Sequence, residues 1–300
     1  MDNDVDTGKD TGEATDGHAG GPSTPGRGTA QDGGGQILTV VGPWEEQVVF
    51  TAVHAGHDLR PEVRELMVLD EATRLREEDP HSDRIGARLA SGMVMHRSRF
   101  ETDLNRPRER SVYSSPEDSW GLQVWRDGQL PDEVAAGSRQ VHDAWYEELE
   151  KRIARLAARG PFVVFDLHTY NHRRDGPDAP PAPQEGNPDV NVGTGTLDRE
   201  PWAPVVDAFM EAMAAPVIPA TGQRLDVREN VRFWGQNEGR WVHRNFPDTA
   251  CVLALEFKKT FMDEWTGEVD EAHLAQLADA LAGTVPAVTE ALRHVRVPSP

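Results

Sequence analysis

The clearest pattern along the chain is a set of short apolar runs, each bounded by polar, Gly or Pro residues. Runs of this kind, rich in β-branched residues, are typical of buried strands. We therefore predict four strands, over Val48–Val53, Gly92–Met95, Phe162–Leu167 and Val252–Leu255.

Segments with a helical spacing of apolar residues separate these strands. The strongest runs over about residues 131–159, and Gly160 follows it as a stop signal. A second helix is predicted over about residues 270–294. Strands that alternate with helices predict an α/β fold with a mixed, mostly parallel central sheet.

Residues 1–35 differ from the rest of the chain. They are almost entirely Gly, Asp, Thr, Ser and Pro without apolar periodicity, so they cannot bury enough surface to offset the entropy of ordering. We predict a disordered acidic tail over residues 1–35. No repeat or second linker divides the remainder, so residues 36–300 are predicted to form one catalytic domain.

Charge and cysteine content exclude several classes of protein. The formal charge of −20 repels phosphate backbones and anionic lipids, so neither a nucleic acid nor a membrane is expected as a partner. The chain has no long apolar run and no signal-peptide pattern, so we expect a cytoplasmic protein. The single cysteine, Cys251, excludes internal disulfides and cysteine-based zinc clusters.

Three of the predicted strands end in a residue that can bind a metal or move a proton. These residues are His54, His168 and Glu256. In a parallel sheet the carboxyl ends of strands share one edge, where the functional residues of α/β folds collect. Histidines with a carboxylate form the usual ligand set of a catalytic zinc, so the pattern predicts a metal-dependent site at this edge.

Two further segments add groups of the right chemical kind. Residues 79–84 read Asp-Pro-His-Ser-Asp-Arg, and the segment 98–108 contains an Asn-Arg pair that can hold a carboxylate. Together with residues 53–56, 166–171 and 255–264, their order and spacing resemble the N-formylglutamate amidohydrolase family. The resemblance covers about residues 45–265, and Asp-Leu-Asn-Arg-Pro at 103–107 is its most specific element.

The resemblance implies a three-layer α/β/α fold related to the zinc carboxypeptidases, with one catalytic zinc per chain. It implies that the metal ligands are His54, Asp83 and His168. His57 lies three residues after His54, the ligand spacing of carboxypeptidases, and His57 and His81 remain alternatives to Asp83.

The remaining roles that the resemblance implies concern the substrate. Glu256 and Arg99 are the expected catalytic residues, Glu256 as general base and Arg99 at the developing oxyanion. Asn105 and Arg106 are expected to bind the substrate, assisted by Arg240 or Arg244.

The implied reaction is zinc-dependent hydrolysis of the amide bond of an N-acyl amino acid, a small molecule. For an N-formylglutamate-like substrate the products are formate and the free amino acid. The same zinc site would serve another N-acylamino-acid hydrolase or a peptide hydrolase. A non-catalytic metal-binding regulatory module is the alternative outside enzymes, and the retained Glu256 argues against it.

Overall fold

The computed structural model describes residues 28–32 and 35–295. Its strands are β1 (Gly28–Asp32), β2 (Gly35–Val41), β3 (Val48–Ala52), β4 (Gly92–Met95), β5 (Phe162–Tyr170), β6 (Val190–Gly193), β7 (Val217–Ile218), β8 (Gln223–Arg224), β9 (Val227–Glu229) and β10 (Ala250–Lys258). Its α-helices are α1 (Pro61–Leu66), α2 (Glu71–Glu77), α3 (Ser82–Ile85), α4 (Asp132–Ala157), α5 (Arg199–Ala214), α6 (Asn237–Asn245) and α7 (Glu271–Leu292).

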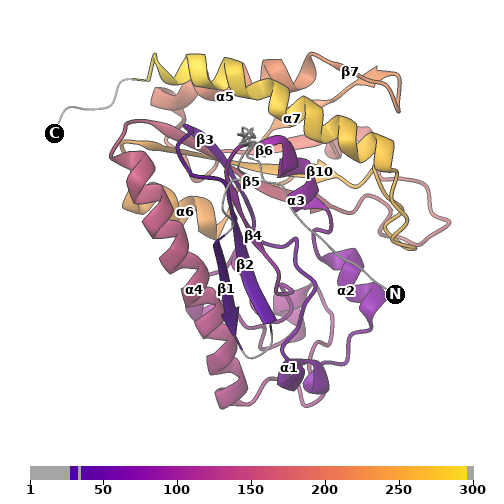
Figure 1. The fold of residues 1–300 in the computed structure, drawn as a ribbon. Helices are drawn as coiled ribbons and strands as arrows, with labels where there is room; N and C mark the ends of the chain where they lie inside the picture. The colour runs from indigo at the N-terminus through magenta and orange to yellow at the C-terminus, as the bar shows by residue number, and fades with distance from the viewer. Residues whose placement is uncertain (1–27, 33–34, 296–300) are drawn as a thin grey trace, which may run out of the picture.

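Eight strands form one sheet in the order β1-β2-β4-β3-β5-β10-β6-β9. The pairs β4–β3, β3–β5, β5–β10 and β6–β9 are parallel, and the other pairs are antiparallel. Helices α5 and α7 lie on one face of the sheet, and α4 and α6 lie on the other (Figure 1). The predicted α/β fold with a mixed, mostly parallel sheet is therefore confirmed, in three layers.

The central strand β5 shows how the two faces are filled. Successive strand residues point to opposite faces, and Val163, Phe165 and Leu167 pack in the same cluster as α5 and α7. Phe162 and Val164 pack instead with α4. By this alternation Asp166 and His168 lie on the α4–α6 face, and in β10 the same reasoning places Glu256 there.

The four predicted strands are present, and two continue beyond the predicted limits, β5 to Tyr170 and β10 from Ala250 to Lys258. The boundary of the predicted tail is corrected: Gly28–Asp32 pairs with β2 as an antiparallel strand, so regular structure begins before residue 36. Apart from Gly35, the rest of that tail lies outside the described residues. Within the described ranges, no helix is long and apolar enough to cross a membrane.

Candidate active site

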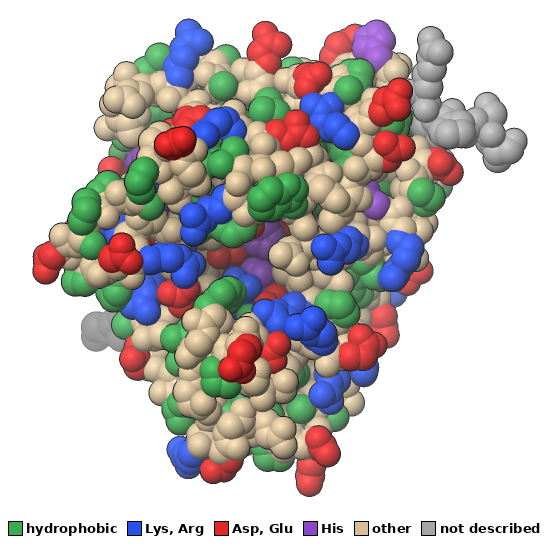
Figure 2. All heavy atoms as spheres, turned by 180° about the vertical axis from the view of Figure 1, so that it is seen from behind, with side chains coloured by type: hydrophobic (Ala, Val, Ile, Leu, Met, Phe, Trp, Pro, Cys, Tyr) green, Lys and Arg blue, Asp and Glu red, His purple; other side chains and the backbone are tan. Residues whose placement is uncertain are grey.

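The three predicted strand ends lie at one edge of the sheet. Strands β3, β5 and β10 are adjacent and parallel, and Glu256 stands beside His168 in the register of β5 and β10. His54 follows β3 within two residues. His54, His168 and Glu256 all line a cavity of about 440 Å³. Figure 2 shows a hollow in the molecular surface, with histidine side chains visible inside it and Lys and Arg side chains around it.

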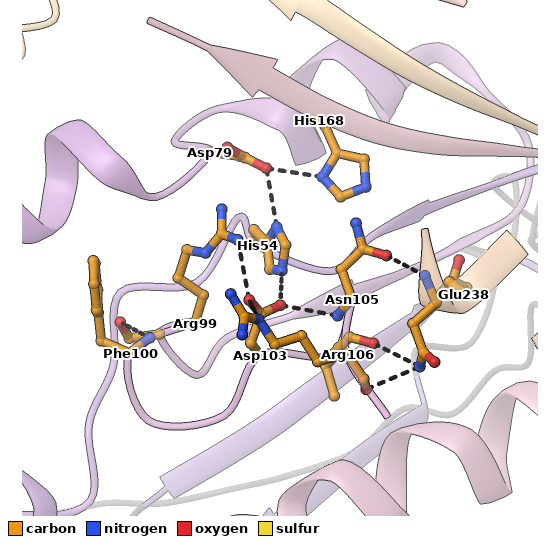
Figure 3. A network of polar contacts seen from close by, with 12 residues as sticks. His54, Asp79, Arg99, Phe100, Asp103, Asn105, Arg106, His168 and Glu238 are labelled. Atoms are coloured by element: carbon orange, nitrogen blue, oxygen red, sulfur yellow. Dashed lines mark hydrogen bonds and ion pairs between the residues drawn. The ribbon is translucent and has the colours of Figure 1, made fainter. Parts of the chain in front are cut away.

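A buried carboxylate, Asp79, joins the two histidines. Its Oδ2 atom lies 3.2 Å from His54 Nδ1 and 3.0 Å from His168 Nδ1 (Figure 3). One potential ligand atom from each residue lies within 4.8 Å of the other two. Among the described residues, these three form the group that could hold a metal ion.

The second nitrogen of each imidazole faces another buried carboxylate. His54 Nε2 lies 2.8 Å from Asp103 Oδ1, and His168 Nε2 lies 3.0 Å from Asp166 Oδ1. The His168 contact is an ion pair by distance without the alignment of a hydrogen bond. Carboxylates in this position fix the ring orientation and the tautomer of metal-binding histidines.

The charges of the cluster suit a cation. Against the effect of burial, hydrogen bonds from His168 and His54 hold the pKa of Asp79 below its usual range. Also against burial, the charge of Asp166 raises the pKa of His168 well above its usual value. The cluster thus stabilises a positive charge between these groups, and two imidazoles with one carboxylate are a ligand set typical of catalytic zinc.

The structure does not bring Asp83, the predicted carboxylate ligand, to the two histidines. Asp83 lies on α3, where its charge acts on His81, Arg84 and His96. The chain takes a left-handed conformation at His81, with φ of 68°, and this turn separates Asp83 from Asp79. The carboxylate that lies between the two histidines is Asp79, whose backbone N–H donates to the His54 carbonyl.

Neither alternative histidine joins the cluster. His57 Nδ1 contacts Glu78 Oε2 at 2.5 Å, and His57 Nε2 contacts Arg74 Nη2 at 3.0 Å, so both ring nitrogens have partners elsewhere. His81 directly precedes α3, and its ring packs edge-on against Phe261.

Glu256 lines the same cavity beside these residues. Burial raises the pKa of its carboxyl to about 7, and the charges of Asp79 and Asp166 act in the same direction against those of His168 and Arg99. A carboxylate with a pKa near neutrality can both accept and return a proton at physiological pH. This is the property required of a general base.

Arg99 is held at the wall of the cavity by three aromatic or acidic neighbours. Its Nη2 donates to Asp103 Oδ2 at 3.1 Å, and its Nε donates to the Tyr113 hydroxyl oxygen at 3.3 Å. The guanidinium carbon lies 4.7 Å from the ring centroid of Trp120. The charge of Arg99 in turn lowers the pKa of Asp103 well below its usual range, although burial opposes this.

The predicted substrate-binding residues Asn105, Arg106 and Arg240 also line the cavity. They differ in their contacts and in their exposure. The Arg106 guanidinium contacts Asp103 Oδ2 at 3.3 Å, Asp118 Oδ1 at 3.3 Å and the Asp118 carbonyl. Arg240, on α6, is exposed. Arg244, its predicted substitute, is exposed one turn further along and is not part of the cavity lining.

The carboxylates behind the histidines were not predicted from the sequence. Asp166 could have been found, because it stands two residues before His168 in a strand and so must point to the same face. Asp103 lies in the family-specific segment 103–107, but its contact with His54 joins residues far apart in the chain. The same holds for Glu238, a fully buried residue of α6 that accepts hydrogen bonds from Thr51 and Trp145.

Comparison with known proteins gives a consistent set of relatives. Residues 46–262 match the N-formylglutamate amidohydrolase family. A protein of Pseudomonas aeruginosa named N-formylglutamate deformylase is 27% identical over 268 residues, which is 82% of this chain and 92% of the relative.

Two solved structures share the fold. An N-formylglutamate amidohydrolase from Ralstonia eutropha JMP134 superposes with a TM-score of 0.62 at 19% identity, covering 87% of this chain and 98% of the other. A gene product from Agrobacterium tumefaciens superposes with a TM-score of 0.59 at 17% identity, covering 86% and 95%.

Proposed function

The chain belongs to the N-formylglutamate amidohydrolase family, and from that premise we propose that it is a metal-dependent hydrolase of N-formyl amino acids. The first substrate to consider is N-formylglutamate, which the Pseudomonas aeruginosa relative is named for deformylating. The products would be formate and the free amino acid. The observation that carries the proposal is the buried His54–Asp79–His168 cluster beside Glu256 in one cavity.

The metal ligands in this proposal are His54 Nδ1, His168 Nδ1 and a carboxylate oxygen of Asp79, with zinc as the ion. When bound, zinc supplies Lewis-acid chemistry that lowers the pKa of water from about 16 toward 7. Asp103 and Asp166 hold the two rings, each by the nitrogen that faces away from Asp79. Loss of such a partner typically weakens metal affinity about 10- to 100-fold.

Glu256 is the general base of the proposed reaction. Its carboxylate takes a proton from the attacking water and later gives it to the departing amine nitrogen. Because burial raises the pKa of this carboxyl to about 7, neither transfer is strongly uphill. General acid–base catalysis of this kind contributes roughly 100- to 10,000-fold.

The polar side chains of the cavity are proposed to bind different parts of the substrate. Arg99, fixed by Asp103 and Tyr113, would stabilise the negative oxygen that develops on the formyl carbon. Arg240 and the Asn105 amide would hold the carboxylate of the amino acid. Arg106 is already ion-paired with Asp103 and Asp118, so it would stabilise the loop that carries Asn105.

Formate release by the purified protein tests the proposal. The zinc-loaded protein is incubated with N-formyl-, N-acetyl- and N-succinylglutamate, and formate and free glutamate are measured. We expect release from the formyl compound, loss of release after removal of the metal by a chelator, and recovery on zinc addition. Release only from the acetyl or succinyl compound would assign another N-acylamino-acid hydrolase, and no turnover of any compound would contradict the proposal.

A further inference from the structure

The first turn of α6 contacts the loop that carries Asn105. The backbone N–H of Asn237 donates to Asn105 Oδ1 at 2.8 Å. The Asn237 side-chain amide donates to the Arg106 carbonyl at 2.9 Å, to the Tyr146 hydroxyl at 2.9 Å and to the Leu104 carbonyl at 3.4 Å. Asn237 therefore binds Asn105 directly and also the residue on each side of it.

These contacts determine which end of the Asn105 amide faces the cavity. A side-chain amide carries an acceptor oxygen and a donor nitrogen of nearly equal size, so its neighbours must select the orientation. Asn237 is the first residue of α6, and an N–H at this position has no partner within the helix. It can bind only the oxygen of Asn105, which leaves the nitrogen on the side of His168 (Figure 3).

The same turn of α6 also carries Arg240, three residues after Asn237. Glu238 in this turn is fully buried and accepts hydrogen bonds from Thr51 on β3 and Trp145 on α4, and these bonds hold the turn against the sheet and α4. Both groups proposed to hold the substrate carboxylate, the Asn105 amide and the Arg240 guanidinium, thus depend on one fixed turn.

We propose that Asn237 is a positioning residue for substrate specificity, which aims the Asn105 amide nitrogen at the substrate carboxylate; this rests on the proposed hydrolysis of N-formyl amino acids. Asn237 does not touch the substrate in this arrangement. Its effect reaches the carboxylate through Asn105, so it should select free acids over their carboxamides.

Two substitutions at position 237 separate its contacts. Asn237→Ala removes the side-chain contacts with the loop and keeps the backbone N–H. Asn237→Pro removes that N–H as well, and proline is well accepted at the first position of a helix. The matched control is Asn245→Ala, at the exposed last residue of α6, where the side chain binds only the carbonyl of Trp241 in the same helix.

The measurement is kcat and KM for an N-formyl amino acid and for its carboxamide. For the free acid we expect Asn237→Pro to raise KM about 10-fold, the size of one hydrogen bond to a charged group, and Asn237→Ala to raise it less. The carboxamide and the Asn245→Ala control should show no such change. In an Asn105→Ala background the substitutions at 237 should have almost no further effect, because the group they orient is gone.

The positioning role would be overturned if the increases in KM caused by the substitutions at 105 and 237 multiply in the double variants. It would also be overturned if the substitutions at 237 raise KM equally for the acid and the carboxamide. A wild type that hydrolyses no N-acyl amino acid would instead contradict the proposed function. The positioning is then tested by the crystal structure of Asn237→Pro, in which the Asn105 amide should leave α6. An unchanged Asn105 amide in that structure would overturn the inference by itself.

Discussion

The floor and the rim of the cavity are built in different ways. The floor consists of His54, Asp79, His168 and Glu256. His54, His168 and Glu256 lie at or just beyond strand ends of the central sheet, and Asp79 contacts both histidines. The His and Asp side chains are almost fully buried. At the rim, Arg99 and Asn105 lie in the loop after β4, and the exposed Arg240 lies on the short helix α6.

This difference predicts how each region responds to change. Floor residues are fixed by the sheet and by buried carboxylate partners, so substitutions there should abolish metal binding or proton transfer. Of the rim residues, Asn105 and Arg240 are proposed to hold the part of the substrate that does not react, so substitutions of these two should change KM and the choice of substrate. Arg99 is proposed to act on the reacting carbonyl instead. The four predictions that follow test this division, with the substitutions ordered from the largest effect to the smallest.

Replacement of Asp79 should have the largest effect. Asp79→Ala removes the carboxylate between the two histidines, so we expect stoichiometric zinc to be lost and turnover to fall to background. Asp83→Ala, four residues away on α3, is the matched control and should keep both. Elemental analysis of the two purified variants measures the zinc content, and zinc loss in Asp83→Ala with retention in Asp79→Ala would assign the carboxylate ligand to Asp83 instead.

Replacement of Glu256 should separate the chemical step from metal binding. Glu256→Gln keeps the size of the side chain and removes the base, so kcat should fall about 100-fold or more while zinc content and KM change little. Steady-state kinetics and elemental analysis of the same preparation measure both quantities. A variant that turns over at the wild-type rate would mean that another group activates the water.

The same residue sets a pH dependence. The Glu256 carboxyl has a pKa of about 7, and its protonated form cannot accept a proton, so kcat/KM of the wild type should rise with pH. A bound cation favours the carboxylate, which places the midpoint at or below about 7. An activity that falls as the pH rises toward neutrality would contradict the assignment.

Replacement of Arg240 should have the smallest effect and change substrate choice. Arg240→Ala should raise KM for a free N-formyl amino acid about 10-fold, the size of a hydrogen bond to a charged group, and leave its carboxamide unchanged. Arg244→Ala, one turn further along α6 and away from the cavity, is the control. If the two arginines respond alike, the carboxylate does not lie at Arg240.

The sequence predicted the position of three of the four floor residues, for a physical reason. A strand points its residues alternately to two faces, and parallel strands end together, so His54, His168 and Glu256 could be placed at one edge from local pattern alone. The roles of these residues stay predictions until tested. Asp166 also follows from the alternation of β5 residues, but Asp103 required knowledge of which loop meets His54.

The errors arose where short turns decide the geometry. Asp79 and Asp83 lie in the same polar segment, and only the left-handed turn at His81 determines which of them reaches the histidines. Arg106 was predicted to bind the substrate, and its guanidinium contacts Asp118, a partner twelve residues later that the sequence pattern did not indicate. Gly28–Asp32 resembles a tail in composition and is a strand because β2 offers it a pairing edge.

The single cysteine has a practical consequence for observing this molecule. Cys251 is fully buried in β10 against the core under α5 and α7, and burial raises the pKa of its thiol. A thiol that is neither exposed nor ionised is inert toward alkylating reagents. A cysteine introduced at the exposed Trp234, next to the cavity-lining Phe233, would therefore take up a fluorescent label selectively and could report ligand entry in the unreduced native protein.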